Sequence, residues 1–240
     1  MHSDTDLLLT SFLGEVRPAV PLIALWAHGS LGAGDYQEGR SDLDLIAVVD
    51  GPIADQSLLE EIHRGYPGRL HCSYLPNDDL GDPGAHHLTC AHGELFRRPV
   101  TPVTRRELHT APVELFGAPV AELLPEVSDA ELSAFVRADL EEFWLAKTDG
   151  FQRWLQDVWV DLGLITVARA AVTLGDGRLI TKREAFDVLD AMGAPSSVVA
   201  DIRARRYGTA APALGRAGRA VLARSFVRHA ITEVLGRAAR

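Results

Sequence analysis

Two aspartates separated by one leucine, Asp42 and Asp44, stand at the start of the apolar run LDLIAVV. Alternate residues of a strand share a face, so both carboxylates are predicted to project from one side while the leucines point into the core. Two like charges placed in this way repel each other unless a cation lies between them. Carboxylate oxygens suit Mg²⁺, which proteins commonly share with substrate phosphates. The sequence therefore predicts a metal site; the alternative is a polar hairpin with this spacing by accident.

A Gly-Ser pair precedes the two aspartates by a dozen residues. Gly29 and Ser30 directly follow the apolar run PLIALWA, where a loop or helix is expected to begin. The backbone N–H groups of such a turn, together with the Ser30 hydroxyl, can bind a phosphate. Gly32 and Gly34 would let the backbone approach a ligand closely. The two motifs together predict a site for a phosphate ester and its metal ion.

Composition limits the remaining possibilities. The 240 residues are 47% hydrophobic, enough for a sizeable core in one or two domains. The apolar run at 21–27 is too short for a signal core or a membrane span, so we expect a cytoplasmic protein without a membrane partner. The net charge of −9 argues against a nucleic-acid partner. Cys72 and Cys90 lack a CxxC pairing, and we expect buried free thiols.

The pattern of apolar residues along the chain changes near residues 123–128. Before this point, short apolar runs alternate with Gly, Pro and Asp, and predict strands in LIALWA, LDLIAVV and RLHCSYL with a helix at 56–64. After it, apolar residues recur every three or four positions. We therefore predict an α+β protein: a domain at 1–125 with a mixed sheet and flanking helices, and an α-helical bundle at 126–240.

Four helices are predicted in the second half. The first starts at Ser128 and the third at Thr181, each with a glutamate three residues later that completes a capping box. The apolar positions assigned to the first helix are Leu132, Phe135, Val136, Leu140, Phe143 and Trp144. Those assigned to the second are Phe151, Leu155, Val158, Leu162 and Ile165, and those assigned to the fourth are Leu222, Phe226, Ala230, Ile231 and Val234.

Several charges break the pattern of these helices. Arg169 falls in the apolar seam of the second helix, so an anion must meet it, either a protein carboxylate or a ligand. Lys182 follows the cap Thr181, in a first turn that disfavours cations unless a phosphate lies nearby. Residues 201–240 carry nine arginines against Asp201 and Glu233. These arginines form either a solvated cationic face or a wall that faces phosphate.

Two acids of the second helix also stand together. Asp157 and Asp161 are one turn apart, a mildly unfavourable pair if both are exposed. A polycationic ligand would make this pair favourable, and Trp154 and Trp159 would border such a site with aromatic rings. The alternative is a solvated acidic face.

The Gly-Ser pair followed by DLDL at a strand start resembles the nucleotidyltransferase fold of the DNA polymerase β type. The stretches GAPVAELLPEVSDAEL and ITVARAAVTLGDGRLITKREA are similar to those of the aminoglycoside adenylyltransferases that modify streptomycin and spectinomycin. The resemblance covers roughly residues 20–210. It implies Mg²⁺-dependent transfer of AMP from ATP to a hydroxyl of a cationic small molecule, and antibiotic resistance by modification. We expect a monomer or weak homodimer.

The resemblance also assigns site residues. Mg²⁺ would bind Asp42 and Asp44. The implied nucleotide contacts are Gly29, Ser30, Ser41, Arg169, Lys182 and Tyr207. The implied substrate contacts are Asp157, Trp159 and Asp161.

One position departs from the family pattern. The family places a third carboxylate on the next strand, where this chain has His71 in the run LHCS. A neutral imidazole can act as general base but is a poorer Mg²⁺ ligand than a carboxylate. Glu94, Asp78 or Asp79 could supply the missing acid. The alternative is a catalytically impaired member that binds a nucleotide or a protein partner in the manner of an antitoxin.

The stretch AHHLTCAHGE could be mistaken for a zinc site. It contains His86, His87, Cys90 and His92. Their spacing is not that of a familiar structural zinc site, and we predict that the stretch forms a loop.

Overall fold

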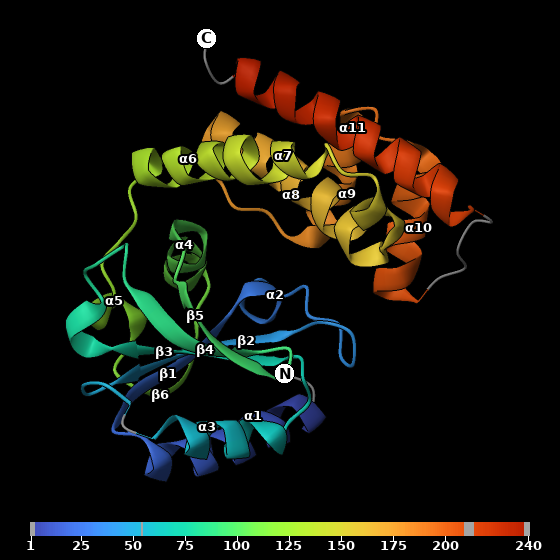
Figure 1. Cartoon of the computed structure of the whole chain (residues 1–240). Coiled ribbons are helices and arrows are strands. Elements are labelled where there is room, and N and C mark those ends of the chain that lie inside the picture. Colours follow the sequence, from blue (N-terminus) through green and yellow to red (C-terminus); the bar gives the residue numbers. More distant parts are fainter. Residues whose placement is uncertain (1–2, 54, 209–213, 238–240) are drawn as a thin grey trace. The chain divides into compact units, whose positions relative to one another are not determined.

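A six-stranded mixed sheet forms the frame of the first half of the chain (Figure 1). The strands are β1 (Leu22–His28), β2 (Leu43–Val49), β3 (Leu70–Pro76), β4 (His86–Ala91), β5 (Glu94–Pro99) and β6 (Val113–Gly117). Their order is β5-β4-β3-β2-β1-β6, and only β2 and β3 pair in parallel. This computed structural model describes residues 3–53, 55–208 and 214–237.

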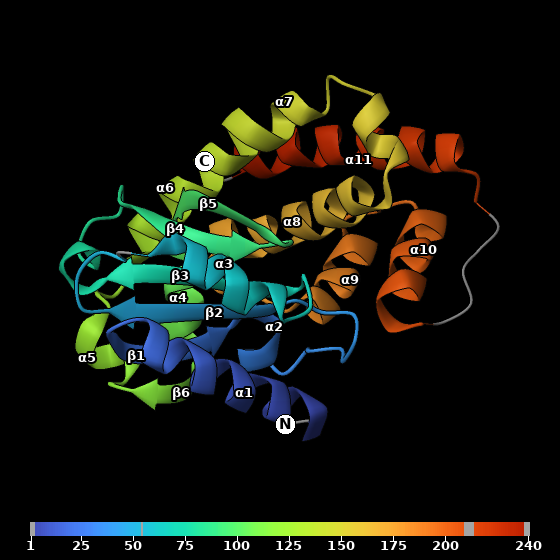
Figure 2. The same cartoon turned by 60° about the horizontal axis from the view of Figure 1, so that its bottom comes forward.

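Helices cover both faces of this sheet (Figure 2). They are α1 (Ser3–Ala19), α2 (Gly29–Gly32), α3 (Gln56–Arg64), α4 (Pro102–Thr110) and α5 (Val120–Leu123), with a 3₁₀ turn at Asn77–Asp79. One core joins β1, β2 and β3 to α1 and α3, and a second joins the opposite face to α4 and α5. The predicted helix at 56–64 is confirmed.

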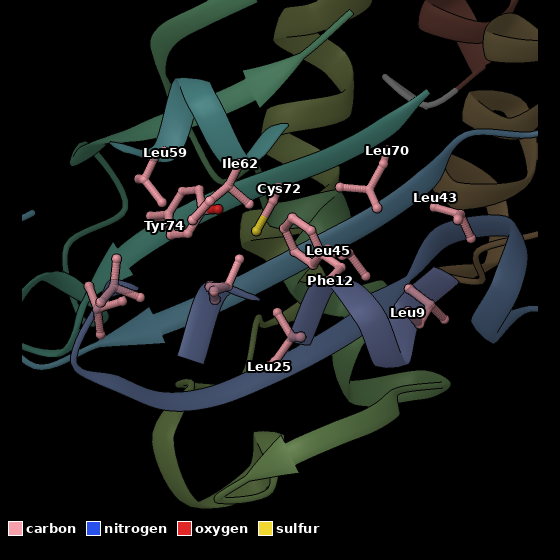
Figure 3. Packing of buried hydrophobic residues seen from close by; sticks show 14 of the residues in the cluster. Leu9, Phe12, Leu25, Leu43, Leu45, Leu59, Ile62, Leu70, Cys72 and Tyr74 are labelled. Carbon is pink, nitrogen blue, oxygen red and sulfur yellow. The ribbon is translucent and has the colours of Figure 1, made fainter. Parts of the chain in front are cut away.

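The first core fixes the direction of the β2 side chains. Leu43 and Leu45 are buried against Leu9 and Phe12 of α1 (Figure 3). Because strand residues alternate between faces, Asp44 projects from the other face, toward the side of the sheet that α4 covers. The buried leucines on either side of Asp44 therefore set where its carboxylate points.

A buried histidine in this core makes stability depend on pH. His63 of α3 is hydrogen-bonded through Nε2 to the Tyr74 hydroxyl at 2.8 Å. Burial, and secondarily electrostatic repulsion by His71, lowers the pKa of His63 to about 4. The unfolded chain, with an ordinary histidine pKa near 6.5, therefore binds a proton that the native state does not.

We expect this difference to cost stability as the pH falls from 6.5 toward 4, by about 3 kcal/mol in total. His63→Gln keeps a hydrogen-bonding side chain but does not titrate. Over this pH range its free energy of unfolding should fall by about 2–3 kcal/mol less than that of the wild type. Urea unfolding of both proteins at pH 7 and at pH 4.5 measures the difference. Parallel losses in the two proteins would contradict the assignment.

The second half of the chain is helical, and the division between the two units falls at Val127 and Ser128. Its helices are α6 (Asp129–Ala138), a π-helix (Asp139–Trp144), α7 (Leu145–Lys147), a 3₁₀ turn (Gln152–Leu155), α8 (Asp157–Asp176), α9 (Lys182–Ala191), α10 (Ser196–Tyr207) and α11 (Arg216–Arg237). The α+β fold class is thereby confirmed. The capping box of Thr181 and Glu184 is present, and the Ser128 side chain accepts from Glu131 N.

The predicted apolar stripe of the second helix is wrong at Val158 and Leu162, although Ile165 is buried. The chain turns at Gln156 before α8 begins, and Val158 and Leu162 are 51% and 44% exposed. The buried face is set instead by Gly163, where a Cβ would lie 2.7 Å from the Trp154 ring. Leu222 of α11 is likewise exposed rather than buried. In α8 a small residue that permits close packing thus decides which face is inside.

Helix α8 is long and apolar enough to cross a membrane by length and composition alone. It packs against α6, α9 and α11, however, and its buried residues include Val160, Leu164 and Val167. This packing is typical of the core helix of a helical bundle.

The prediction of a loop at residues 85–94 is also wrong. His86–Ala91 forms β4, and a tight turn at His92 and Gly93, both with positive φ, connects it to β5. The strand was not predicted because histidine is a polar residue that interrupts the apolar alternation typical of a strand, although His87 is buried. Cys72 and Cys90 face each other across β3 and β4 as buried free thiols, as predicted.

Candidate active site

The candidate site lies at the edge of the sheet where β1 ends and where β2 and β3 begin. In this register Asp44 is opposite His28 of β1 on one side and His71 of β3 on the other. Asp42 lies immediately before β2. The pairing of these strands therefore brings together His28, Asp44 and His71, which are far apart in the sequence.

The His71 ring lies against both aspartates. Its Nδ1 is 3.3 Å from Asp44 Oδ1, and its Nε2 is 4.0 Å from Asp42 Oδ1. The imidazole is 7% exposed, while the carboxylates of Asp44 and Asp42 are 32% and 44% exposed. The buried Nε2 makes no hydrogen bond. His92, at the β4–β5 turn, contacts this ring edge-on with centroids 4.4 Å apart.

The Gly-Ser turn passes directly over Asp44. Gly29 has a φ of +63°, and a Cβ at this position would lie 3.0 Å from Asp44 Oδ2. A side chain here would be strained and would press on the carboxylate. Glycine thus allows the first turn of α2, which carries Ser30, to lie beside the aspartate.

The donor set fits a magnesium ion that is shared with a phosphate. Mg²⁺ in nucleotide-dependent enzymes is commonly held by one or two carboxylates, substrate phosphates and waters. Asp42 and Asp44 offer two partly exposed carboxylates on one edge of the sheet. Within the described ranges no group of three or more His, Cys, Asp and Glu side chains could hold a metal by itself. A phosphate would complete this site.

The other acids considered for the third carboxylate lie elsewhere. Asp78 and Asp79 follow the far end of β3, more than about 15 Å of extended chain beyond His71. Glu94 lies at the same end of the sheet as His71 but on β5, two strands away from β3, and it is exposed. The residue that lies beside both aspartates is therefore His71.

Ser41 has a structural contact in the turn before the aspartates. Its hydroxyl accepts the N–H of Gln37 at 3.0 Å, and the residue is buried. This hydrogen bond fixes the loop that leads into Asp42. The predicted nucleotide contact of Ser41 stays a prediction.

The helical unit holds the three other predicted nucleotide residues on α8, α9 and α10. Arg169 Nε donates to the carbonyl of Ile180 at 2.9 Å, next to the cap of α9. Lys182 is the first residue of α9 and Tyr207 the last of α10. The Tyr207 ring lies 5.2 Å from the Arg183 guanidinium. The start of α9 is therefore rich in cations.

In the structure both acids of the α8 pair are bonded to arginines of the helical unit. Asp161 receives hydrogen bonds from Arg205 Nε and Nη2, and Asp157 is paired with Arg219. Burial raises the pKa of Asp161, and the hydrogen bond from Arg205 opposes this shift. Both carboxylates are neutralised by Arg205 and Arg219, so these two of the nine arginines are bonded to protein carboxylates and do not form a solvated face.

The tryptophans of the predicted wall differ from each other. Trp154 is fully buried, and its indole N–H donates to the carbonyl of Lys147 at 3.0 Å. Trp159 is half-buried, with its ring near those of Phe143 and Trp144. Trp154 is thus a core residue. The substrate roles predicted for Asp157, Trp159 and Asp161 remain predictions.

The sequence interpretation did not select His28 and Glu107. His28 Nδ1 lies 3.0 Å from Glu107 Oε2 of α4, next to Asp44 in the sheet. His28 could have been selected from the sequence, because it is a polar residue between a buried strand and the Gly-Ser turn. Nothing in the spacing of Glu107 indicated that it would reach this edge.

Comparisons with known proteins support this fold. The structure is similar to the crystal structure of spectinomycin adenyltransferase AAD(9) from Enterococcus faecialis with ATP and spectinomycin, with a TM-score of 0.67 and 17% sequence identity. The match covers 96% of this chain and 99% of that one. No protein-family model matches the sequence, and no curated protein matches it. The chain therefore has the fold of an aminoglycoside adenylyltransferase, as the resemblance implied.

Proposed function

We propose that this protein is a nucleotidyltransferase that transfers AMP from ATP to a hydroxyl of a cationic small molecule, most simply an aminoglycoside or aminocyclitol antibiotic. The observation that carries the proposal is the sheet edge where Asp42, Asp44 and His71 meet beside the Gly29 turn. The likeness in fold to an adenyltransferase crystallised with ATP and spectinomycin supports it.

The residues divide the work of an in-line displacement. Asp42 and Asp44 would hold Mg²⁺, which when bound supplies charge neutralisation at the phosphates. The backbone N–H groups of the Gly29 turn and the Ser30 hydroxyl would orient the phosphate chain. His71 would accept the proton of the attacking hydroxyl, the role that a carboxylate has in the resembled family. Arg169 and Lys182 are proposed to neutralise phosphate, and Tyr207 to contact the base or ribose.

A direct assay tests the activity. Protein, Mg²⁺ and ATP are incubated with streptomycin or spectinomycin, and the products are analysed by mass spectrometry for the added adenylyl group and released pyrophosphate. We expect modification of at least one compound in a broad aminoglycoside panel. If folded protein that binds ATP modifies none of them, the proposed substrate class is wrong.

A second candidate function follows from the imidazole at the third carboxylate position. A chain that kept the nucleotide site but lost transfer would serve as a nucleotide-binding or partner-binding module. Calorimetry with ATP and Mg²⁺ separates the cases. Binding without AMP transfer to any acceptor supports the module, whereas failure to bind at high Mg²⁺ concentration indicates a protein-interaction role.

Variants of His71 test its proposed role. We expect His71→Ala to lower the rate of AMP transfer about 100-fold, the lower end of what a general base contributes, with little change in ATP affinity. His71→Glu should recover most of that rate, because a carboxylate at this position can also accept the proton. Steady-state kinetics and ATP calorimetry on all three proteins provide the measurement. An unchanged rate in the alanine variant would exclude His71 as the base.

A further inference from the structure

The Gly-Ser turn is too small to hold its own shape. Helix α2 has four residues and none of them is buried. A single helical turn fixes several dihedral angles for very few hydrogen bonds and is unstable alone. A turn that must present N–H groups to a phosphate therefore needs support from a neighbouring element.

The first support comes from Glu107 of α4. Its Oε2 lies 3.0 Å from Nδ1 of His28, the last residue of β1 and the N-terminal flanking residue of α2. An ionised carboxylate only accepts hydrogen bonds, so Nδ1–H of His28 donates. Both side chains are largely buried, at 11% and 19% exposure. This contact holds the start of the turn.

The second support comes from the end of the same helix. The carbonyl of Ala111 lies 2.0 Å from the position that a Cβ of Gly32 would occupy. Ala111 itself is fixed by its N–H, which donates to the carbonyl of Glu107 at 2.9 Å. Ala111 directly follows α4, four residues after Glu107. Glu107 and the C-terminal end of α4 therefore contact the two ends of the turn, at His28 and at Gly32.

From these contacts we infer that Glu107 is a positioning residue for the phosphate-binding turn and, through it, for Asp44. His28 pairs with Asp44 in the sheet, and Gly29 lies against the Asp44 carboxylate. A shift of His28 is therefore passed both to the turn and to the aspartate. The inference rests on the proposed function for its effect on ATP, but the effect on the turn is independent of activity.

Glu107→Ala, Glu107→Gln and a control test this inference. The control is Glu15→Ala, which removes another helix carboxylate of the same unit, one that accepts the Tyr66 hydroxyl at 2.7 Å. Hydrogen exchange in the protein without nucleotide reports on the turn through the amides of Ala33, Gly34 and Asp35, which donate within it. Steady-state kinetics then give KM for ATP and kcat.

We expect Glu107→Ala to speed exchange of these amides about 10-fold and to raise KM for ATP about 10-fold, the usual size of a supporting-contact effect. Its kcat should change less than its KM. Glu107→Gln retains an oxygen that can accept a hydrogen bond from His28. Its amide exchange rates at the turn and its KM for ATP should therefore be close to those of the wild type. Glu15→Ala should leave both unchanged.

Unchanged exchange at the turn in Glu107→Ala would overturn the inference. So would a speed-up that extends equally to the amides of β3 and persists in Glu107→Gln, because Glu107 would then affect general stability only. If the wild type binds no ATP while exchange at the turn still responds to Glu107, the proposed function fails and the positioning role stands.

Discussion

Replacing Asp44 by asparagine is expected to lower AMP transfer by about 10³-fold. A metal bound at a phosphoryl group contributes several kcal/mol to the transition state, and each 1.4 kcal/mol corresponds to a factor of ten. Asparagine keeps the size of the side chain but removes the negative charge that the ion requires. The fold should remain, because Asp44 is partly exposed and its backbone still pairs with His28 and His71.

Asp50→Asn is the matched control. Asp50 is exposed and follows the other end of β2, so the same chemical change there should leave the rate within about twofold, in line with the small effects of exposed surface substitutions. Calorimetry should show that Asp44→Asn weakens ATP binding only when Mg²⁺ is present. A variant that transfers AMP at the wild-type rate would show that this aspartate does not serve a metal, and the transferase proposal would lose its main support.

The local part of this site could be predicted from the sequence. Strand alternation places Leu43 and Leu45 in the core, and this alone directs Asp42 and Asp44 to the other side. The positive φ of Gly29 is the kind of conformation that a glycine at a ligand turn indicates. Both inferences depend on residues that are neighbours in the chain.

The parts that depend on distant packing could not be predicted. Glu107 reaches His28 across 79 positions of sequence, and Asp161 is bonded to Arg205 across 44. No local pattern encodes such pairs. The prediction that Val158 and Leu162 of α8 are buried is wrong for the same reason, because the close fit of Gly163 against Trp154 decides which face is buried. The strand β4 was missed because its histidines obscured the alternation.

The two arginines that neutralise the α8 acids share a third carboxylate, and we expect its removal to have a large effect on stability. Asp201 of α10 is the shared acceptor of two arginines: Arg205 Nη1 lies 2.5 Å and Arg219 Nη1 lies 3.2 Å from its Oδ2. Asp201 and Arg219 are almost completely buried. Removing one partner of a buried ion pair leaves a charge without compensation in a poorly solvated place, which typically costs 3–5 kcal/mol.

We expect Asp201→Ala to lower the free energy of unfolding by about 3 kcal/mol, because Arg205 and Arg219 each keep one other carboxylate. Urea unfolding followed by tryptophan fluorescence measures this, since Trp144, Trp154 and Trp159 all lie in the helical unit. The control is Asp149→Ala, which removes the exposed pair with Arg228 at 2.6 Å and should cost at most about 1 kcal/mol.

The comparison of these two variants separates structure from substrate binding. If the network stabilises the fold, Asp201→Ala should strongly lower the urea concentration at the midpoint of unfolding. At urea concentrations below that midpoint, KM for the acceptor should stay near the wild-type value. Equal, small effects of Asp201→Ala and Asp149→Ala on unfolding would show that the network adds little to the fold. Its acids would then have to be considered again as ligands for a cation, as their spacing on α8 first indicated.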